Sequence, residues 1–140
     1  METKENIIIN IKDYSLSPGP RYAEQGCSSG EDFYHKVLNK NFAEAYKNGL
    51  KLIVVLDGVD GYASSFLDEA FGNLVYDFGV NVVESVLIIE SQEEPEWINM
   101  IKTSTYNEWE KRRLNNSNPK YSVTHEERYV LEGDSVVLKN

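Results

Sequence analysis

The residues best placed to do chemistry lie where an apolar run gives way to an amphipathic one, in VVLDGVDGYASSFLDEAFGNLV. Two adjacent hydroxyls, Ser64 and Ser65, stand at the predicted start of a helix. The first turn of a helix leaves backbone amides unpartnered and carries the positive end of the helix dipole, which stabilises an anion. A phosphate on either serine would be tolerated there, although Asp68 and Glu69 oppose it. The alternative is structural, because Ser65 is a favoured N-cap residue with Asp68 at the third helical position.

The connection before these serines contains Asp57, Gly58, Asp60 and Gly61. Ligands of open α/β sheets bind beyond the carboxyl ends of the strands, where this connection falls. The two glycines let the backbone take a positive φ or come close to a partner. We therefore predict a binding surface over residues 57–68, which we call the loop-helix edge.

Arg21 lies in PGPRY, within a second long loop over residues 18–30. A guanidinium close to helix N-termini could pair with Asp57 or Glu31, or hold an anion. The structural pairing is the favoured interpretation. Loops of this length in compact domains are often functional, so residues 18–30 are a second candidate part of the binding surface.

Catalytic interpretations of the carboxylates find little support. A receiver-type phosphoaspartate at Asp57 would need an acidic cluster for Mg²⁺, and only Asp13 follows the first predicted strand. A Mg²⁺ site built from Asp57, Asp60, Asp68 and Glu69 is conceivable, but a solvated loop and a capped helix explain the same residues.

A thiol dyad is the other catalytic candidate. Cys27 precedes a helix start, where a thiol pKa can fall, and His35 lies eight residues later. That separation is about two helical turns, which favours loop packing over a Cys–His dyad. The chain has no G-x-S-x-G, P-loop or G-x-G-x-x-G pattern. We predict no catalytic residues, no cofactor and no metal site.

Hydrophobic patterning predicts the elements that position these residues. Strands are expected over 6–11, 52–56 and 82–90, the second being apolar on both faces and therefore central and buried. Helices are expected from Ser28 or Ser29 to about Asn48, from Ser65 to about Phe78, and from Pro95 to about Leu114. This alternation indicates an α/β sandwich with a mixed, mostly parallel sheet covered by helices.

The second of these helices has the clearest pattern. Its apolar residues step by three and four, giving one stripe made of Leu67, Ala70, Phe71, Leu74, Val75 and Phe78. Beyond residue 116 the composition changes, and two β-like runs around Glu132-Gly133-Asp134-Ser135 predict a hairpin. We expect one domain over residues 1–116 and a C-terminal extension over 117–140.

Composition excludes several classes of function. A net charge of −9 argues against nucleic-acid binding, and the basic run at Lys111 to Arg113 is flanked by Glu108 and Glu110. No apolar run approaches the length of a membrane span. The single cysteine excludes an intrachain disulfide framework. Together these features predict a cytoplasmic protein.

The segment LDGVDGYASSFLDEAFGNLV, with the upstream PGPRYAEQGCSSGEDF, resembles the STAS-like domain family of unknown function over about Ile8 to Ile101. That family is similar to the STAS anti-sigma-factor antagonists, in which the loop after a central strand carries a serine phosphorylated by a histidine-kinase-type ATPase. The resemblance places that position on Ser64. Two residues depart from the antagonist pattern, since Ala63 replaces an aspartate and Phe66 replaces a glycine.

The resemblance and the loop-helix edge together predict a non-enzymatic interaction module in a bacterial or phage regulatory or defence pathway. A histidine-kinase-type ATPase or a co-encoded protein is the expected partner, serine phosphorylation is the expected switch, and a homo-oligomer is compatible with this interpretation. The alternative is a small enzyme, or a nucleotide or anion sensor, that uses the same surface.

Overall fold

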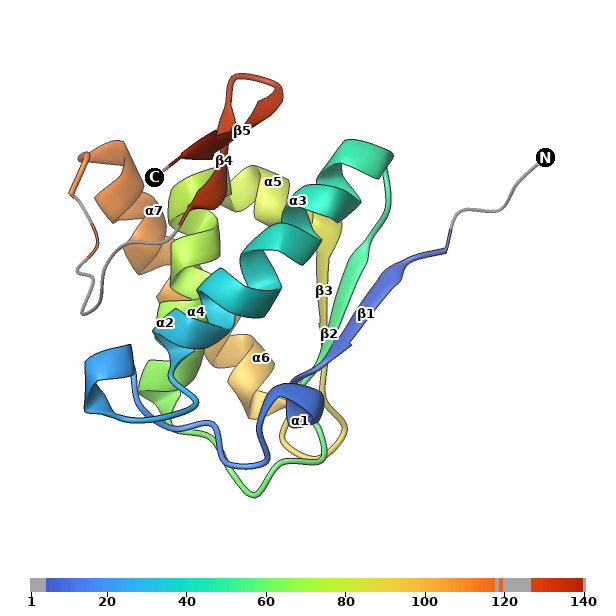
Figure 1. Cartoon of the computed structure of the whole chain (residues 1–140), viewed down its shortest axis with the longest axis vertical. Coiled ribbons are helices and arrows are strands. Elements are labelled where there is room, and N and C mark those ends of the chain that lie inside the picture. The colour runs from blue at the N-terminus through green and yellow to red at the C-terminus, as the bar shows by residue number, and fades with distance from the viewer. Residues whose placement is uncertain (1–4, 118, 120–126, 140) are drawn as a thin grey trace.

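A three-stranded parallel sheet forms one layer of the molecule. The computed structural model describes residues 5–117, 119 and 127–139. The strands are β1 (Ile7–Asn10), β2 (Leu52–Val55) and β3 (Leu87–Glu90), in the spatial order β1-β2-β3 (Figure 1). Their register aligns Ile8, Ile53 and Ile88 in one row across the sheet. The predicted α/β architecture with a parallel sheet is confirmed.

The connection from β1 to β2 is mostly helical. It contains α1 (Ile11–Tyr14), a 3₁₀ turn (Ala23–Gln25), and a continuous helical stretch made of α2 (Gly30–Phe33), a π-helical turn (Tyr34–Leu38) and α3 (Asn39–Asn48). Ser29 caps this stretch by accepting a hydrogen bond from the Asp32 amide at 2.9 Å. Gly49 ends it with φ 67°, a conformation that glycine adopts without strain. The predicted start and end are confirmed.

Helix α4 (Ser64–Phe78) lies at the centre of the molecule, and every residue of its predicted apolar stripe is buried. It passes so close to α7 (Tyr106–Leu114) that a Cβ on Gly72 would lie 2.1 Å from the Trp109 ring. The helix ends at Gly79, as predicted, where φ is 88°. The core of the domain is therefore built around this helix.

The segment predicted as a strand over 82–90 is correct only in its second half. Residues Val80–Val86 form a helix, α5, and β3 begins at Leu87. The amide of Val83 donates to the Gly79 carbonyl, and Val83 and Val86 are buried. The β-branched residues suggested a strand, but helical spacing buries this pair and tertiary packing overrides propensity.

The last helical stretch begins after Pro95, as predicted, and ends at Leu114. It consists of α6 (Glu96–Met100), a π-helical turn (Ile101–Thr105) and α7. Ile101 and Trp109 are buried anchors, whereas Trp97 and Ile98 are only partly buried.

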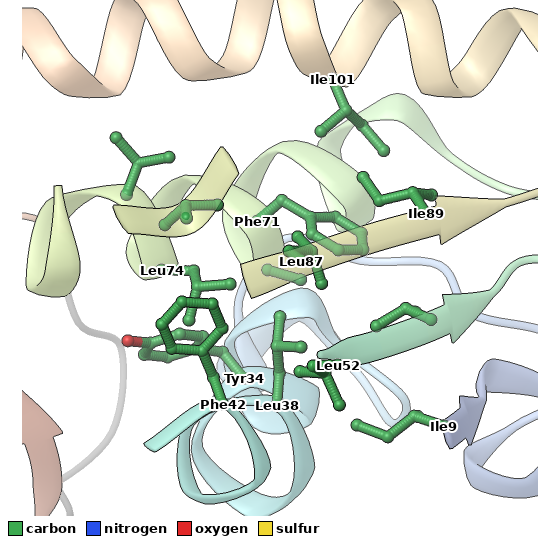
Figure 2. Close-up of a cluster of buried hydrophobic side chains, with 14 of the residues drawn as sticks. Ile9, Tyr34, Leu38, Phe42, Leu52, Phe71, Leu74, Leu87, Ile89 and Ile101 are labelled. Atoms are coloured by element: carbon green, nitrogen blue, oxygen red, sulfur yellow. The ribbon is translucent and has the colours of Figure 1, made fainter. Parts of the chain in front are cut away.

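The helices pack on one face of the sheet. Figure 2 shows Ile9, Leu52 and Leu87 turned toward the helical side chains, including Phe71 and Leu74. On the other face Ile8 is 60% exposed and Ile88 is 40% exposed. Strand β2 is central, as predicted, but it is not buried on both faces, because Ile53 and Val55 are only partly covered.

The predicted C-terminal hairpin is confirmed as β4 (Arg128–Glu132) and β5 (Ser135–Lys139). It forms a separate two-stranded sheet that packs on the helices (Figure 1). The Asn39 side chain donates to the Tyr129 carbonyl and accepts from the Tyr129 amide, both at 2.8 Å. Arg128 pairs with Asp77 at 3.0 Å, and Val130 is buried. Within the described residues, no helix is long and apolar enough to cross a membrane.

Candidate functional site

Asp57 lies directly after β2, and its carboxylate organises the neighbouring loop after β3. It accepts hydrogen bonds from the amides of Gln92 at 2.9 Å and Glu93 at 3.0 Å, and from the Ser91 hydroxyl at 3.0 Å. These backbone amides hold the pKa of Asp57 below its usual value. Asp57, for which the sequence already disfavoured a phosphoaspartate role, thus holds two strand-end loops together.

The loop that follows is fixed at two further points. The Gly58 amide donates to Glu93 Oε1 at 2.7 Å, and Gly58 has φ 89°, which confirms the need for glycine there. The Asp60 amide donates to the Leu16 carbonyl at 2.7 Å, and its carboxylate accepts from the Ser17 hydroxyl at 3.0 Å. The other glycine of this loop, Gly61, does not take a positive φ and has open space beside it.

Tyr62 anchors the end of the loop. Its hydroxyl donates to the Leu56 carbonyl at 2.5 Å, so the loop closes back onto the end of β2. Its ring lies 6.2 Å from that of Phe66 and 6.4 Å from that of Trp97, centroid to centroid. The loop is consequently a fixed surface feature with contacts at both ends.

The paired serines begin α4, and neither caps it. Ser64 is the first helical residue and is exposed, and Ser65 is partly exposed. Ala63 occupies the N-cap with φ −89° and ψ 137°, and makes no side-chain hydrogen bond. The prediction that Ser65 caps the helix is therefore wrong, because the N-cap lies two residues earlier than the pattern suggested. Within the described residues, neither serine side chain forms a hydrogen bond.

Arg21 pairs with the second turn of α4. Its Nη1 lies 2.7 Å from Asp68 Oδ2 and 3.0 Å from Glu69 Oε1. The prediction of a structural ion pair is right, but the predicted partners, Asp57 and Glu31, are wrong. Glu31 instead accepts a hydrogen bond from the Ala23 amide at 2.9 Å, which fixes the turn after Arg21.

Further donors complete the cluster around Asp68 and Glu69. Asp68 accepts from the Thr105 hydroxyl at 3.0 Å and from Trp109 Nε1 at 3.2 Å. Glu69 accepts from Asn73 Nδ2 at 3.0 Å, and burial raises its pKa above the usual value. Sequence placed both carboxylates in the first turn beside the helix dipole, whereas they lie one turn later and are held by side chains.

The structure thus divides the predicted site residues into two groups. Asp57, Gly58 and Asp60 lie in the fixed loop, and Arg21 and Asp68 form an ion pair on the flank of α4. Sequence reasoning missed the loop after β3, whose Ser91 and Glu93 contact the first group. The place of this loop in the site could have been predicted from the sequence, because parallel neighbouring strands bring the loops at their carboxyl ends together.

The catalytic alternatives gain no support from the geometry. Among the described residues, no three acidic, histidine or cysteine side chains converge as metal ligands. Cys27 is exposed in an open pocket of about 500 Å³ bordered by Asp32 and Lys36. His35 is not part of that lining, and its Nδ1 lies 2.9 Å from the Glu31 carbonyl.

The fold and the strand-end loop together define a small α/β domain with one helical layer. Residues 29–97 match the sequence profile of a family described as a STAS-like domain of unknown function. The match identifies this part of the chain as a STAS-like domain, which contains the loop-helix edge and both serines but not Arg21. It begins later than the predicted resemblance, which started at about Ile8. No curated protein and no solved structure matches the chain.

Proposed function

We propose that this chain is a non-enzymatic interaction module that docks a partner protein through the loop-helix edge, with Ser64 as its switch. The carrying observation is that Ser64 is exposed at the start of α4, directly after a loop held by contacts at Asp57, Gly58 and Tyr62. A surface that is already ordered loses little conformational entropy on binding, which favours docking. The carboxylates beside it are used in structural contacts, which supports an interaction role over a catalytic one.

The charge of this edge indicates the chemistry of the partner. Asp60, Glu93 and Glu94 are exposed around the loop. Complementary potentials speed association and suppress wrong partners, so we expect the partner to present Arg and Lys side chains here. A histidine-kinase-type ATPase or a co-encoded protein, in a bacterial or phage regulatory or defence pathway, is the proposed source of that surface.

Phosphorylation of Ser64 would add charge in the first turn of α4. Arg21 already offsets Asp68 and Glu69, the acidic groups that lie next along the helix. The helix dipole also favours negative charge at this end. A phosphate at Ser64 is therefore compatible with the fold, and it would strengthen contact with a basic partner surface.

The experiment measures the affinity of purified co-encoded partner candidates for the parent chain, Ser64→Asp and Ser64→Ala by calorimetry. Ser104→Asp is the matched control, because Ser104 is also exposed and lies in the last helical stretch. We expect Ser64→Asp to bind more tightly at low salt, with the gain shrinking as salt screens it. Equal effects of the two aspartate variants would contradict the proposal.

The second candidate function is that of an anion or nucleotide sensor. The exposed N-terminus of α4 is the one observation that favours it. Titration of the parent chain with ATP, GTP and inorganic phosphate, followed by amide chemical shifts, distinguishes the two. Saturable shifts at the amides of residues 58–66 would favour the sensor, and shifts seen only with a protein partner favour the docking module.

A further inference from the structure

One edge of β1 has no strand paired to it within the described residues. β1 pairs with β2 on one side and is the outermost strand of the sheet (Figure 1). Natural edge strands are commonly blunted by short length, lysine, proline, bulges or a covering element, since bare edges pair with other chains. β1 is short, with four residues, but residues 6–10 read NIIIN and contain neither lysine nor proline.

The hydrogen-bonding groups of β1 alternate between its two edges. The Ile7 amide donates to the Lys51 carbonyl at 3.0 Å, so Ile7 and Ile9 direct their backbone groups toward β2. Ile8 and Asn10 therefore direct their amides away from β2, toward the free edge. A groove of about 280 Å³ lies beside β1, bordered by Asp13 and Tyr14 of α1 and by Val37 and Asn41 of the first helical stretch.

The sequence of this strand is symmetric about Ile8. In an antiparallel pair of two copies centred on Ile8, each Ile8 lies opposite its equivalent, Ile7 lies opposite Ile9, and Asn6 lies opposite Asn10. Ile8 of each copy would donate to and accept from Ile8 of the other, because the amide and carbonyl of one residue serve the same edge. Within residues 6–10 every cross-strand pair then joins like with like, and none of these pairs contains a charged side chain.

The row of apolar side chains on the open face of the sheet includes Ile8, the residue about which this pairing is centred. Ile8, Ile53 and Ile88 are aligned across the three strands, and Ile8 is the most exposed of the large apolar residues in this row. A two-fold axis at Ile8, normal to the sheet, would extend this row into the second copy. It would also keep the helices of both copies on the same side of the joined sheet.

We infer that β1 is a dimerisation edge, and that a second copy of this chain adds to it in antiparallel orientation to give a continuous six-stranded sheet. The like-with-like pairing about Ile8 selects a second copy over an unrelated extended peptide. The loop-helix edge takes no part in this pairing, so the inference stands apart from the proposed function.

The test is the oligomeric state of the full chain by sedimentation velocity and light scattering, from about 1 µM to about 1 mM. We expect a concentration-dependent dimer in the parent and its loss in Ile8→Lys, because a charge on the edge opposes pairing. Ile88→Lys is the matched control, since it has the same chemistry in the same row but on the other edge strand. It should retain the dimer.

Ile8→Pro gives a second way to block the edge. It removes an amide that points away from β2, so the ladder between β1 and β2 should survive while pairing is lost. Far-UV circular dichroism confirms that each variant is folded. A parent chain that stays monomeric throughout, or an Ile8→Lys chain that still dimerises, overturns the inference. Equal loss in Ile8→Lys and Ile88→Lys also overturns it, because that result indicates stacking of the open faces.

A cross-link fixes the register directly. In a Cys27→Ser background, Ile8→Cys should form an intermolecular disulfide under mild oxidation. Opposite residues of a hydrogen-bonded antiparallel pair have Cα atoms about 5.5 Å apart, which lies within disulfide range. Ile88→Cys in the same background should stay reduced, and cross-linking of that variant alone would overturn the inference.

Discussion

Replacing Arg21 with methionine tests whether this residue holds the flank of α4. The substitution keeps much of the apolar stem and removes the guanidinium that contacts Asp68 at 2.7 Å and Glu69 at 3.0 Å. Asp68 keeps its donors from Thr105 and Trp109. The Glu69 side chain is only 2% exposed, so its carboxylate would remain buried without a counter-charge.

The expected loss follows from that burial. Removing one partner of a buried ion pair destabilises proteins by about 3–5 kcal/mol. Because the Arg21 side chain is 29% exposed and Glu69 keeps its hydrogen bond from Asn73, we expect a loss near the lower end, about 3 kcal/mol at pH 7. For a domain of this size, that corresponds to a fall in Tm of roughly 10 °C.

The loss should also depend on pH. Burial already raises the pKa of Glu69, and removing Arg21 should raise it further. A carboxyl whose folded pKa exceeds its unfolded value destabilises the fold above the unfolded pKa, and that penalty grows until pH passes the folded pKa. The gap between Arg21→Met and the parent should therefore be larger at pH 8 than at pH 5.

Urea unfolding followed by circular dichroism at both pH values measures this gap. Lys36→Met is the matched control, because Lys36 pairs with Asp32 at 3.0 Å with its own side chain 61% exposed, and should change stability by less than about 1 kcal/mol. Adding Glu69→Gln to Arg21→Met should remove the pH dependence. An Arg21→Met chain as stable as the parent, or a loss equal at pH 5 and pH 8, would refute the reasoning.

Three further predictions follow from the packing of α4. Leu74→Ala should destabilise the fold by about 2–5 kcal/mol, measured by urea unfolding, because the side chain is fully buried; an unchanged midpoint would mean that it does not face the core. Ser64→Ala and Ser65→Ala should each change stability by less than about 0.5 kcal/mol in thermal melts, since neither caps the helix. A chain ending at Asn116 should unfold at lower urea than the full chain, because Asp77 loses Arg128; an equal midpoint would make the hairpin energetically irrelevant.

Periodicity predicted the parts of the fold in which the local pattern and the packing agree. The stripe through Phe71 and Leu74 requires only a helix over a sheet, and that helix is what forms. The strand prediction failed over the part of the chain that forms α5, Val80–Val86, because β-branched residues favour strands locally. In the structure, Glu110 accepts a hydrogen bond from the Val80 amide, and the Gly79 carbonyl accepts one from the Val83 amide. Those partners are set by tertiary structure, which a single sequence does not display.

The positions of the candidate residues were predicted better than their contacts, and their role in binding stays a prediction. The loop after β2 could be found because strand-end loops follow from topology. The partners of Arg21 could not, because Asp68 lies 47 residues away and several carboxylates were equally plausible by spacing. The capping assignment of Ser65 failed because the N-cap lies two residues earlier, at Ala63, which is within the usual variation of helix ends.

Helix α4 connects the features on which the proposed function rests. Its first residue is the exposed Ser64, its second turn is held by Arg21, and its last turn carries Asp77, which holds the hairpin through Arg128. A docking edge built on such a helix offers a partner fixed positions rather than a loop to be ordered. The entropic penalty of binding then falls mainly on the partner, and discrimination depends on complementary charge and shape at the edge. Under the proposed function, this arrangement lets a domain whose carboxylates serve structural contacts present a specific surface to its partner.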